Sequence, residues 1–369
     1  MTRTSDLRTY RRVRAAGIAL PLLLAACGDD MAPDEFAQLA PPDAVTVSAG
    51  AGEPPAAPHD AAALRAWQVE LRAHLGRLFA APAAAQAPPA VISREPLDAP
   101  RDLLRELVVM RSADGTKVPA ILQRPRQARA CAAIVVIPGH VPESDSGLRQ
   151  VVYDDDSYQA AAATRLAHAG FVTLSFELRG FGLLGRPLGT EHRHVAYNAL
   201  LDGRFYKALV IDDARAAIDV LLREPGVDGT RLGVTGASLG GELAVTLAAL
   251  DERVAAVAWS AYGGRAGPFR PAAGTAGKQR HYCHIIPGSG EFMRDEDVTL
   301  LIAPRPALGL RGSRDYKPDE AYARLTAATW ATLGAPERFE FETIPERGHE
   351  FFVEQTIDFF VRTLGPACE

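Results

Sequence analysis

Apolar and polar positions follow two different periods from residue 103 to the C-terminus. Short segments rich in apolar residues predict strands at 104–110, 117–123, 131–137, 171–176, 232–237, 254–259, 306–310 and 339–344. The run at 131–137 is continuously apolar, as expected of a strand buried on both faces. Between the predicted strands, apolar residues recur at steps of three and four and predict helices at 156–169, 207–222, 242–250, 321–333 and 356–364. Alternating strands and helices predict an α/β fold, with a mainly parallel sheet covered by helices on both faces.

The first two predicted strands follow a different pattern from the later ones. No helix separates 104–110 from 117–123, and the short connection contains Asp114-Gly115, a pair that is common in tight turns between antiparallel strands. The sequence therefore predicts an antiparallel leading hairpin at one edge of the sheet. Residues 103–369 are expected to form the catalytic domain.

The segment before this domain divides into a tether and a lead-in. Residues 28–60 are rich in Ala and Pro and cannot bury enough apolar surface to fold, so we expect a disordered tether. Residues 61–102 are interpreted as a lead-in helix and linker. Its helical part, 61–79, has apolar residues at helical spacing: Leu64, Trp67, Leu71, Leu75 and Leu78.

Residues 1–27 have the pattern of a secretory signal peptide. An arginine-rich start precedes the apolar segment 15–26, which is shorter than the about 20 residues needed to span a bilayer. Leu24-Ala25-Ala26-Cys27 resembles the lipobox of bacterial lipoproteins, which implies lipidation at Cys27 and anchoring to the cell envelope. Gly28 after the cysteine favours sorting of the lipoprotein to the outer membrane, with the folded part in the periplasm or outside the cell. The alternative is an ordinary cleaved signal peptide in which Cys27 has no special role.

One long segment interrupts the alternation of strands and helices. Residues 261–298 contain Gly, Pro and short polar stretches, and loops of this length inside a compact domain are usually functional. Two interpretations remain open: a cap over the active site, or a surface excursion.

Composition and charge exclude some function classes. Of 369 residues, 47% are hydrophobic, which is enough for a core, and the net charge of −5 gives no indication of nucleic acid as the main partner. Besides Cys27 the chain has Cys131, Cys283 and Cys368, an odd number whose pairing the sequence leaves open. His281-Tyr-Cys283-His284 lacks a fourth partner at short spacing, so we expect no metal site there.

The central motif is Gly236-Ala-Ser238-Leu-Gly240, between a predicted strand and a predicted helix. This is the nucleophile-elbow pattern, in which a serine occupies a sharp strand-to-helix turn and small neighbours avoid collisions. The helix N-terminus behind the serine favours negative charge developing nearby. A glycine-rich turn with a capping serine is the simpler alternative, and the strand-turn-helix context favours the elbow.

A reactive serine needs a base and a group that orients that base. In proteins with the nucleophile-elbow motif, the acid follows the serine in the chain, and the histidine follows the acid. Asp315 follows the strand 306–310, and His349 follows the strand 339–344, so both lie where open α/β sheets assemble their sites. We expect Ser238, His349 and Asp315 to form the triad, with His281 and His284 as weaker candidates for the base.

An oxyanion formed during the reaction requires backbone donors already in place. The residue after the nucleophile supplies one, the N–H of Leu239. The loop after the strand 131–137 is expected to supply the other, the N–H of His140, with Val141 as the alternative.

The chain from about Leu103 onward resembles the α/β-hydrolase fold. It is most similar to the branch with the dienelactone hydrolases and the acetyl xylan esterase/cephalosporin deacetylase-type enzymes. The resemblance rests on the elbow, on Arg179-Gly180-Phe181, and on His349-Glu350. Phe181 and Leu239 stand where the acetyl xylan esterase type has glutamines. The resemblance implies hydrolysis of small esters without a metal ion or organic cofactor.

The predicted function is therefore a serine carboxylic-ester hydrolase acting through an acyl-enzyme, with acetylated carbohydrate as one candidate substrate. The alternatives are a serine peptidase of the prolyl-oligopeptidase type and a non-catalytic envelope lipoprotein. The former usually carries a large propeller domain before the catalytic one, and the latter typically lacks a triad member.

Overall fold

The computed structural model describes residues 54–80, 90–126, 129–142, 144–263, 282–315, 320–365 and 368. The predicted signal peptide 1–27, Cys27 and most of the predicted tether lie outside these residues, as does the middle of the 261–298 segment. Residues 51–369 form one compact unit.

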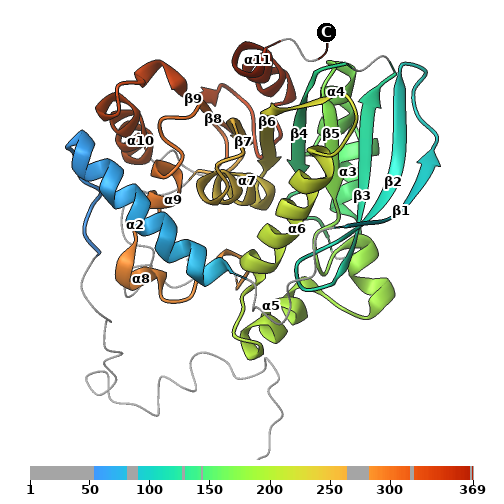
Figure 1. Cartoon of the computed structure of the whole chain (residues 1–369), viewed down its shortest axis with the longest axis horizontal. Helices are drawn as coiled ribbons and strands as arrows, with labels where there is room; N and C mark the ends of the chain where they lie inside the picture. Colours follow the sequence, from blue (N-terminus) through green and yellow to red (C-terminus); the bar gives the residue numbers. More distant parts are fainter. Residues whose placement is uncertain are drawn as a thin grey trace, which may run out of the picture. The chain divides into compact units, whose positions relative to one another are not determined.

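A nine-stranded sheet forms the centre of this unit (Figure 1). Its strands are β1 (Ala90–Leu97), β2 (Leu103–Arg111), β3 (Lys117–Pro125), β4 (Cys131–Ile137), β5 (Val172–Phe176), β6 (Val227–Ala237), β7 (Ala256–Ser260), β8 (Ala307–Gly312) and β9 (Phe339–Ile344). The spatial order is β1-β2-β3-β5-β4-β6-β7-β8-β9. From β5 to β9 neighbouring strands are parallel, whereas β1, β2, β3 and β5 pair antiparallel. The expected α/β fold with an antiparallel leading hairpin is confirmed.

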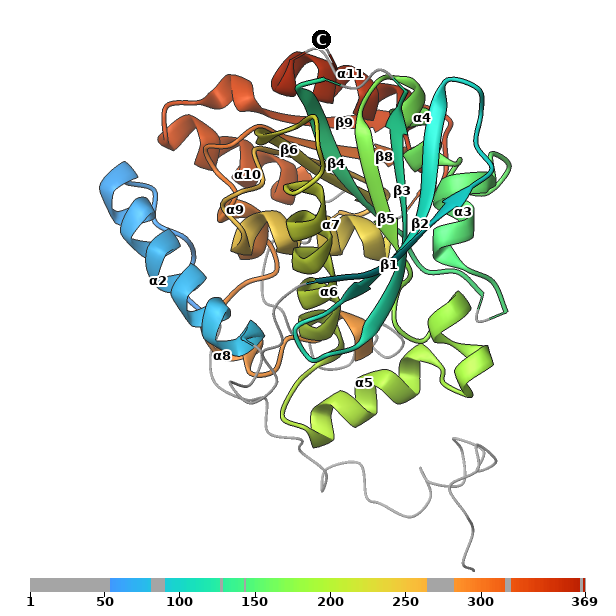
Figure 2. The ribbon, with the colours of Figure 1, turned by 45° about the vertical axis from the view of Figure 1, so that its right-hand side comes forward.

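Helices cover both faces of the sheet (Figures 1 and 2). The helices are α2 (Ala61–Phe79), α3 (Gly147–Tyr153), α4 (Ala162–His168), α5 (His192–Leu201), α6 (Tyr206–Leu221), α7 (Leu239–Leu250), α8 (Ser289–Phe292), α9 (Asp297–Leu300), α10 (Glu320–Thr332) and α11 (Val353–Leu364). Residues of α2, α6, α7 and α10 join one buried cluster, and residues of α3, α4 and α11 join the other.

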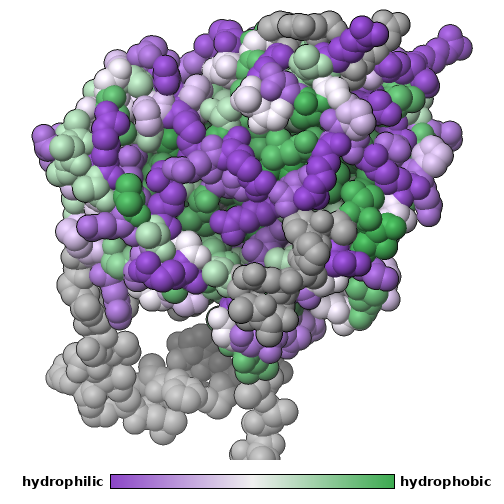
Figure 3. Space-filling view, viewed as in Figure 1, coloured by the Kyte–Doolittle hydropathy of each residue, from purple (hydrophilic) through white to green (hydrophobic). Residues whose placement is uncertain are grey.

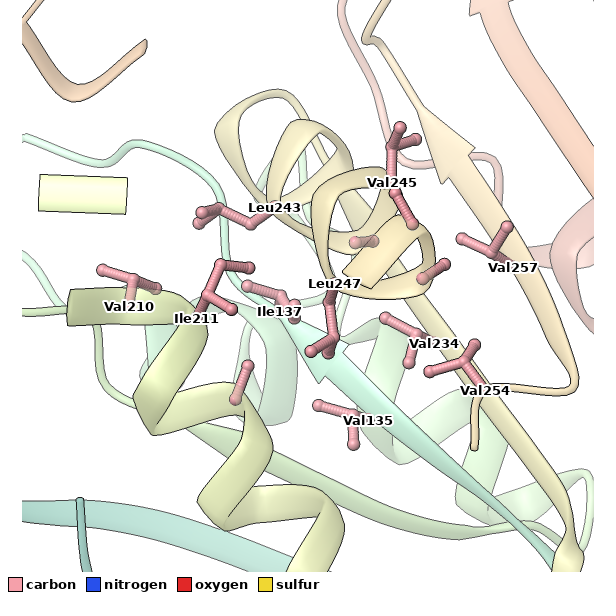
Figure 4. Packing of buried hydrophobic residues seen from close by; sticks show 14 of the residues in the cluster. Val135, Ile137, Val210, Ile211, Val234, Leu243, Val245, Leu247, Val254 and Val257 are labelled. Atoms are coloured by element: carbon pink, nitrogen blue, oxygen red, sulfur yellow. The ribbon is translucent and has the colours of Figure 1, made fainter. Parts of the chain in front are cut away.

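Side chains of β4 alternate between these two clusters, as the period of a strand requires. Val135 and Ile137 point to the side of α6 and α7, where they meet Leu247 and Ile211 (Figure 4). Ile134 and Val136 belong to the opposite cluster. Because β4 is buried on both faces, the continuous apolar run in its sequence is explained.

The predicted helix 61–79 is present as α2 and packs on the domain. Asp60 caps its start, accepting hydrogen bonds from the N–H groups of Ala62 and Ala63 at 3.0 and 2.9 Å. Gln68 donates to the carbonyl oxygens of Leu300 and Ala303 at 2.7 and 3.1 Å. The helix is therefore attached by buried hydrogen bonds as well as by its apolar face.

The structure differs from the sequence-based expectation before β2. Strand β1 lies within the segment 61–102, where the sequence predicts only a helix and a linker. Residues 90–97 form a strand because their backbone groups pair with those of β2, the neighbouring strand in the sheet. The apolar signal of β1 is weak, and Val91 and Ile92 remain exposed at the sheet edge.

The predicted helix 156–169 is shorter than expected. Only α4, from Ala162 to His168, is helical, and α3 precedes it. The Asp154 side chain accepts a hydrogen bond from the N–H of Ser157 at 3.1 Å, and the Ser157 hydroxyl donates to the Asp154 carbonyl. Such local bonds favour a turn over a helix start. Helix α5, in a segment without clear periodicity, is an addition to the prediction.

A disulfide joins Cys131, at the start of β4, to Cys368, with a sequence separation of 237. It pairs two of the three cysteines whose partners the sequence leaves open. The third, Cys283, is buried and forms no disulfide.

Polar residues are distributed over the face of the molecule on which α2 and α6 lie, with apolar residues visible between them (Figure 3). Within the described part of the chain, no helix combines the length and the apolar character needed to cross a membrane.

Candidate active site

Ser238 lies in the sharp turn between β6 and α7. Its backbone has φ 58° and ψ −123°, a conformation that costs free energy for a residue with a side chain. Its N–H donates to the carbonyl of Ser260 on β7 at 2.9 Å, which holds the turn in place. The serine is therefore held in the strained geometry that the Gly-x-Ser-x-Gly pattern predicts.

The flanking glycines are required by close backbone approach. A Cβ atom on Gly240 would lie 2.1 Å from the carbonyl oxygen of Ile137, and one on Gly236 would lie 2.4 Å from the backbone of Gly240. These contacts leave no room for any side chain. They also place the loop after β4 directly against the first turn of α7.

Leu239 is the first residue of α7 and is buried. The first N–H groups of a helix have no acceptor within it, and the helix dipole makes this end positive. The N–H of Leu239 thus stands beside the serine at a position suited to a developing negative charge.

His349 and Asp315 are paired. Nδ1 of His349 lies 2.9 and 3.1 Å from the two carboxylate oxygens of Asp315. The Asp315 side chain is only 7% exposed, while that of His349 is 35% exposed. A buried carboxylate on Nδ1 fixes the orientation of the His349 ring.

Backbone hydrogen bonds join the loops that carry this pair. The N–H of Ser313, after β8, donates to the carbonyl of Ile344 at the end of β9 at 2.9 Å. The N–H of Arg314 donates to the carbonyl of Arg347 at 2.8 Å. Two loops distant in sequence therefore form one unit at the carboxyl edge of the sheet.

Tyr158 connects this unit to Ser238. Its hydroxyl donates to the carbonyl of His140 at 2.7 Å, and its own carbonyl accepts from the N–H of Phe351 at 2.8 Å. Its ring centroid lies 5.7 Å from that of His349. Burial raises the pKa of the Tyr158 hydroxyl well above its usual value, while a hydrogen bond with Ser238 lowers it. Tyr158 therefore stays protonated and contacts the serine.

Sequence reasoning did not identify Tyr158. It lies in the turn after α3 within a segment predicted to be a helix, and no motif surrounds it. Its partners are His140, Ser238 and Phe351, which only the folded chain brings together.

The loop after β4 is fixed by a side chain from the same turn. The N–H of Gly139 donates to Oε1 of Gln159 at 2.7 Å, and Gln159 is fully buried. This hydrogen bond occupies the N–H of Gly139. The next two N–H groups along the loop belong to His140 and Val141, the two residues predicted as oxyanion donors.

The His140 ring belongs to a cluster of polar side chains from the loop after β4, from α7 and from residues 282–284. Nε2 of His140 lies 3.2 Å from the Cys283 sulfur. The neighbouring His284 hydrogen-bonds through Nδ1 to Glu242 on α7, and Glu242 also pairs with buried Lys207. His284 is therefore paired with Glu242, and the predicted triad acid, Asp315, is paired with His349. The other weaker candidate, His281, lies outside the described residues.

Charges in this cluster stabilise one another. Burial would raise the pKa of Glu242, but Lys207 and His284 lower it well below its usual value. Burial would lower the pKa of His284, but Glu242 raises it to about 10. A carboxylate thus remains ionised inside the domain, four residues after Ser238.

The Arg179-Gly180-Phe181 segment has a structural role in the described residues. The Arg179 guanidinium pairs with Asp213 on α6 and with Asp114 in the turn of the leading hairpin. Phe181 stacks on His192 with a centroid separation of 4.5 Å. Arg179 therefore ties the loop after β5 to two other elements.

Comparison with known proteins places this geometry in a family. Residues 118–359 match the model of the dienelactone hydrolase family. A Bacillus subtilis (strain 168) protein, YtaP, which is named only as a hydrolase, is 25% identical over 228 residues, covering 60% of this chain and 74% of that protein.

Solved structures agree on the fold. A Bacteroides fragilis NCTC 9343 protein described as an acetyl xylan esterase has a TM-score of 0.63 at 18% identity, with 79% of this chain and 78% of that chain covered. A glucuronoyl esterase from Solibacter usitatus has a TM-score of 0.56 at 17% identity, with 81% and 93% covered. The family match spans most of the sheet, from β3 to α11, and includes the serine elbow. This chain therefore belongs to the dienelactone hydrolase family of α/β-hydrolases, a family of hydrolytic enzymes.

Proposed function

We propose that the protein is a serine carboxylic-ester hydrolase with Ser238 as nucleophile, His349 as general base and Asp315 as the acid that orients it. The observation that carries this proposal is the pair formed by Nδ1 of His349 and the buried Asp315 carboxylate, on the same sheet edge as the strained Ser238 turn. Carboxylate, imidazole and hydroxyl in this chain order are the parts that acyl transfer requires.

In the proposed reaction, His349 takes the proton of the Ser238 hydroxyl as its oxygen attacks the ester carbonyl carbon. Asp315 stabilises the imidazolium that forms. The proton then passes to the oxygen of the leaving alcohol, the carbon–oxygen bond breaks, and an acyl-enzyme remains. Water, activated by the same imidazole, releases the acid and restores the hydroxyl.

The tetrahedral oxyanion is assigned to the N–H of Leu239 and the N–H of His140. Gly139 directs its own N–H to Gln159, which supports the next residue of the loop as the second donor. Val141 is the alternative. Removal of one such donor typically costs about 2.7–4 kcal/mol of transition-state stabilisation.

The proposed substrate class is a small ester, and an acetylated carbohydrate is the first candidate. Support comes from the fold shared with a protein described as an acetyl xylan esterase, which is an argument from analogy. We further propose an envelope lipoprotein anchored through Cys27, in the periplasm or at the outer membrane. The Cys131–Cys368 disulfide supports an oxidising compartment.

The decisive experiment is labelling by a fluorophosphonate probe, with the modified peptide mapped by mass spectrometry. Wild type is expected to carry the label on Ser238 and to hydrolyse p-nitrophenyl acetate. Ser238→Ala is expected to lose both, and Ser93→Ala on β1 serves as the matched serine control. Label on another residue, or undiminished turnover by Ser238→Ala, would contradict the assignment.

The same variants distinguish the competing functions. Acetylated xylan and a chromogenic peptide are offered to wild type and Ser238→Ala in parallel. Release of acetate without peptide cleavage supports the esterase, and the reverse supports the serine peptidase. Absence of label and of turnover on every substrate would support the non-catalytic lipoprotein.

A further inference from the structure

A second group of reactive side chains lies beside the proposed triad. It consists of His140, from the loop after β4, and Cys283 and His284, from the short 3₁₀ helix Tyr282–His284. One donor atom from each of the three lies within 4.8 Å of the other two, and Nε2 of His140 is 3.2 Å from the Cys283 sulfur. Cys283 is completely buried. Three metal-ligating side chains therefore converge from segments about 140 residues apart.

We propose that His140, Cys283 and His284 bind a divalent transition metal, with Zn²⁺ as the ion that best fits the donors. A thiolate and two imidazoles form a borderline-soft set, which suits Zn²⁺ and disfavours Mg²⁺ or Ca²⁺. Three protein ligands leave one position of a tetrahedron for water or another donor. The proposal goes beyond the esterase chemistry, which uses none of these side chains as acid, base or nucleophile.

The surroundings of the cluster resemble those that protein metal sites need. Glu242 accepts a hydrogen bond from Nδ1 of His284, which fixes the ring and assigns Nε2 to the metal. Lys207 pairs with the other Glu242 oxygen and compensates its charge inside the domain.

The fold explains why the sequence indicates no such site. Cys283 and His284 are adjacent, but the third ligand, His140, is distant in sequence and belongs to the loop after β4. A bound ion would fasten the segment 282–284 to the loop that carries the proposed second oxyanion donor. The site therefore has a positioning role for that loop.

The test measures metal directly. Full-length protein is stripped with a chelator, and Zn²⁺ or Co²⁺ is titrated back with metal content and absorption as readouts. Wild type is expected to bind about one equivalent of Zn²⁺. With Co²⁺ it is expected to show the near-ultraviolet absorption of a thiolate–cobalt bond. Cys283→Ser is expected to lose that absorption, and His284→Ala is expected to bind Zn²⁺ at least about 10-fold more weakly.

His168→Ala is the matched control, because His168 hydrogen-bonds to Asp102 on the surface and is not part of the cluster. It is expected to bind metal like wild type. Thermal unfolding of every variant in chelator verifies that each is folded, and added Zn²⁺ should raise the transition temperature of wild type but not of Cys283→Ser. Equal Zn²⁺ binding by wild type and Cys283→Ser, or no cobalt–thiolate absorption in wild type, would overturn the proposal.

The outcome is independent of the esterase assignment. Fluorophosphonate labelling of Ser238 in the chelator-treated protein reports on the triad without any metal. Labelling without metal binding leaves the esterase proposal intact and refutes the metal site. Metal binding without labelling supports the metal site and refutes the esterase proposal.

Discussion

Tyr158 shows how much one side chain contributes to the candidate site. Its hydroxyl, its carbonyl and its ring contact three separate segments: the loop of His140, the turn of Ser238, and the loop of His349. Because it stays protonated, it acts through hydrogen bonds and is a positioning residue. The geometry of the whole site therefore depends on a residue that takes no proton in the proposed reaction.

Tyr158→Phe tests this role. The substitution removes the bond to the His140 carbonyl and leaves a polar group unsatisfied, which costs about 1–3 kcal/mol. The N–H of His140, the proposed second oxyanion donor, should then be misplaced. We expect kcat for p-nitrophenyl acetate to fall by roughly 10-fold with little change in KM. Steady-state kinetics and the rate of fluorophosphonate labelling measure it. Tyr153→Phe, at an exposed position of α3, is the control. An unchanged kcat in Tyr158→Phe would contradict the positioning role.

At the scale of residues, the sequence predicts the parts with a local reason. Ser238 and its glycines are recognisable because the turn excludes other side chains. Asp315 and His349 are predicted from strand ends, and the structure brings them together. Tyr158, Glu242 and Lys207 were not predicted, because their partners come from elsewhere in the chain and a buried ion network has no period.

At the scale of elements, α2 and α9 depend on each other. Gln68 of α2 is buried and donates two hydrogen bonds, to Leu300 in α9 and to Ala303 just after it. Arg72 of α2 donates to the carbonyls of Ala249 and Leu301. The lead-in helix is thus part of the folded unit, and its loss would expose carbonyl groups of the helices beneath it.

Gln68→Ala should destabilise the protein by about 1–3 kcal/mol, because two carbonyl oxygens lose a buried donor. Urea unfolding followed by circular dichroism measures the change. Glu70→Ala, on the exposed side of the same helix, is the control and should stay within about 0.5 kcal/mol of wild type. Equal stability of the two variants would show that α2 is only loosely attached.

Asp297, at the start of α9, makes stability depend on pH. Burial raises its pKa to about 7, against a hydrogen bond from the Arg294 N–H that lowers it. Its Oδ1 has no hydrogen-bond partner among the described residues. Between pH 4 and 7, roughly, the folded state keeps a proton that the unfolded chain releases, so this group makes stability fall as pH rises.

Asp297→Asn cannot ionise and should lack that decline. At pH 8 the variant should exceed wild type by roughly 1–3 kcal/mol, while at pH 4 the two should be similar. Denaturant unfolding at both pH values measures the difference. Asp358→Asn, at an exposed position of α11, is the control. A wild type that gains stability relative to Asp297→Asn as pH rises would contradict the sign.

At the scale of the whole molecule, the mainly parallel sheet and its antiparallel leading hairpin were predictable from the sequence, whereas the edge strand β1 was not. Strands β4, β5, β7 and β8 are buried along their whole length, and the sequence identifies them by their apolar content. Strand β1 has one exposed face and depends on β2 for its hydrogen bonds, so composition suggested a linker. The disulfide partner of Cys131 is likewise set by tertiary proximity alone.

The Cys131–Cys368 disulfide closes most of the domain into one covalent loop, because its cysteines are 237 residues apart. Replacing both by alanine should lower the free energy of unfolding by roughly 2–5 kcal/mol. The proposed triad of Ser238, His349 and Asp315 involves neither cysteine, so kcat at 25 °C should be unchanged. Thermal unfolding and kinetics of the double variant test this. A large loss of kcat without a loss of stability would be the contrary result.

The hydrogen bonds between the loops after β8 and β9 have a consequence for how the site can adapt. These main-chain hydrogen bonds join the loop of Asp315 to the loop of His349, so the carboxylate and the imidazole must shift together or not at all. Adjustment to substrates of different size is then left to segments outside these two loops. Selection for new esters in the laboratory should spare the main-chain contacts between the loops after β8 and β9 and accumulate changes elsewhere around Ser238.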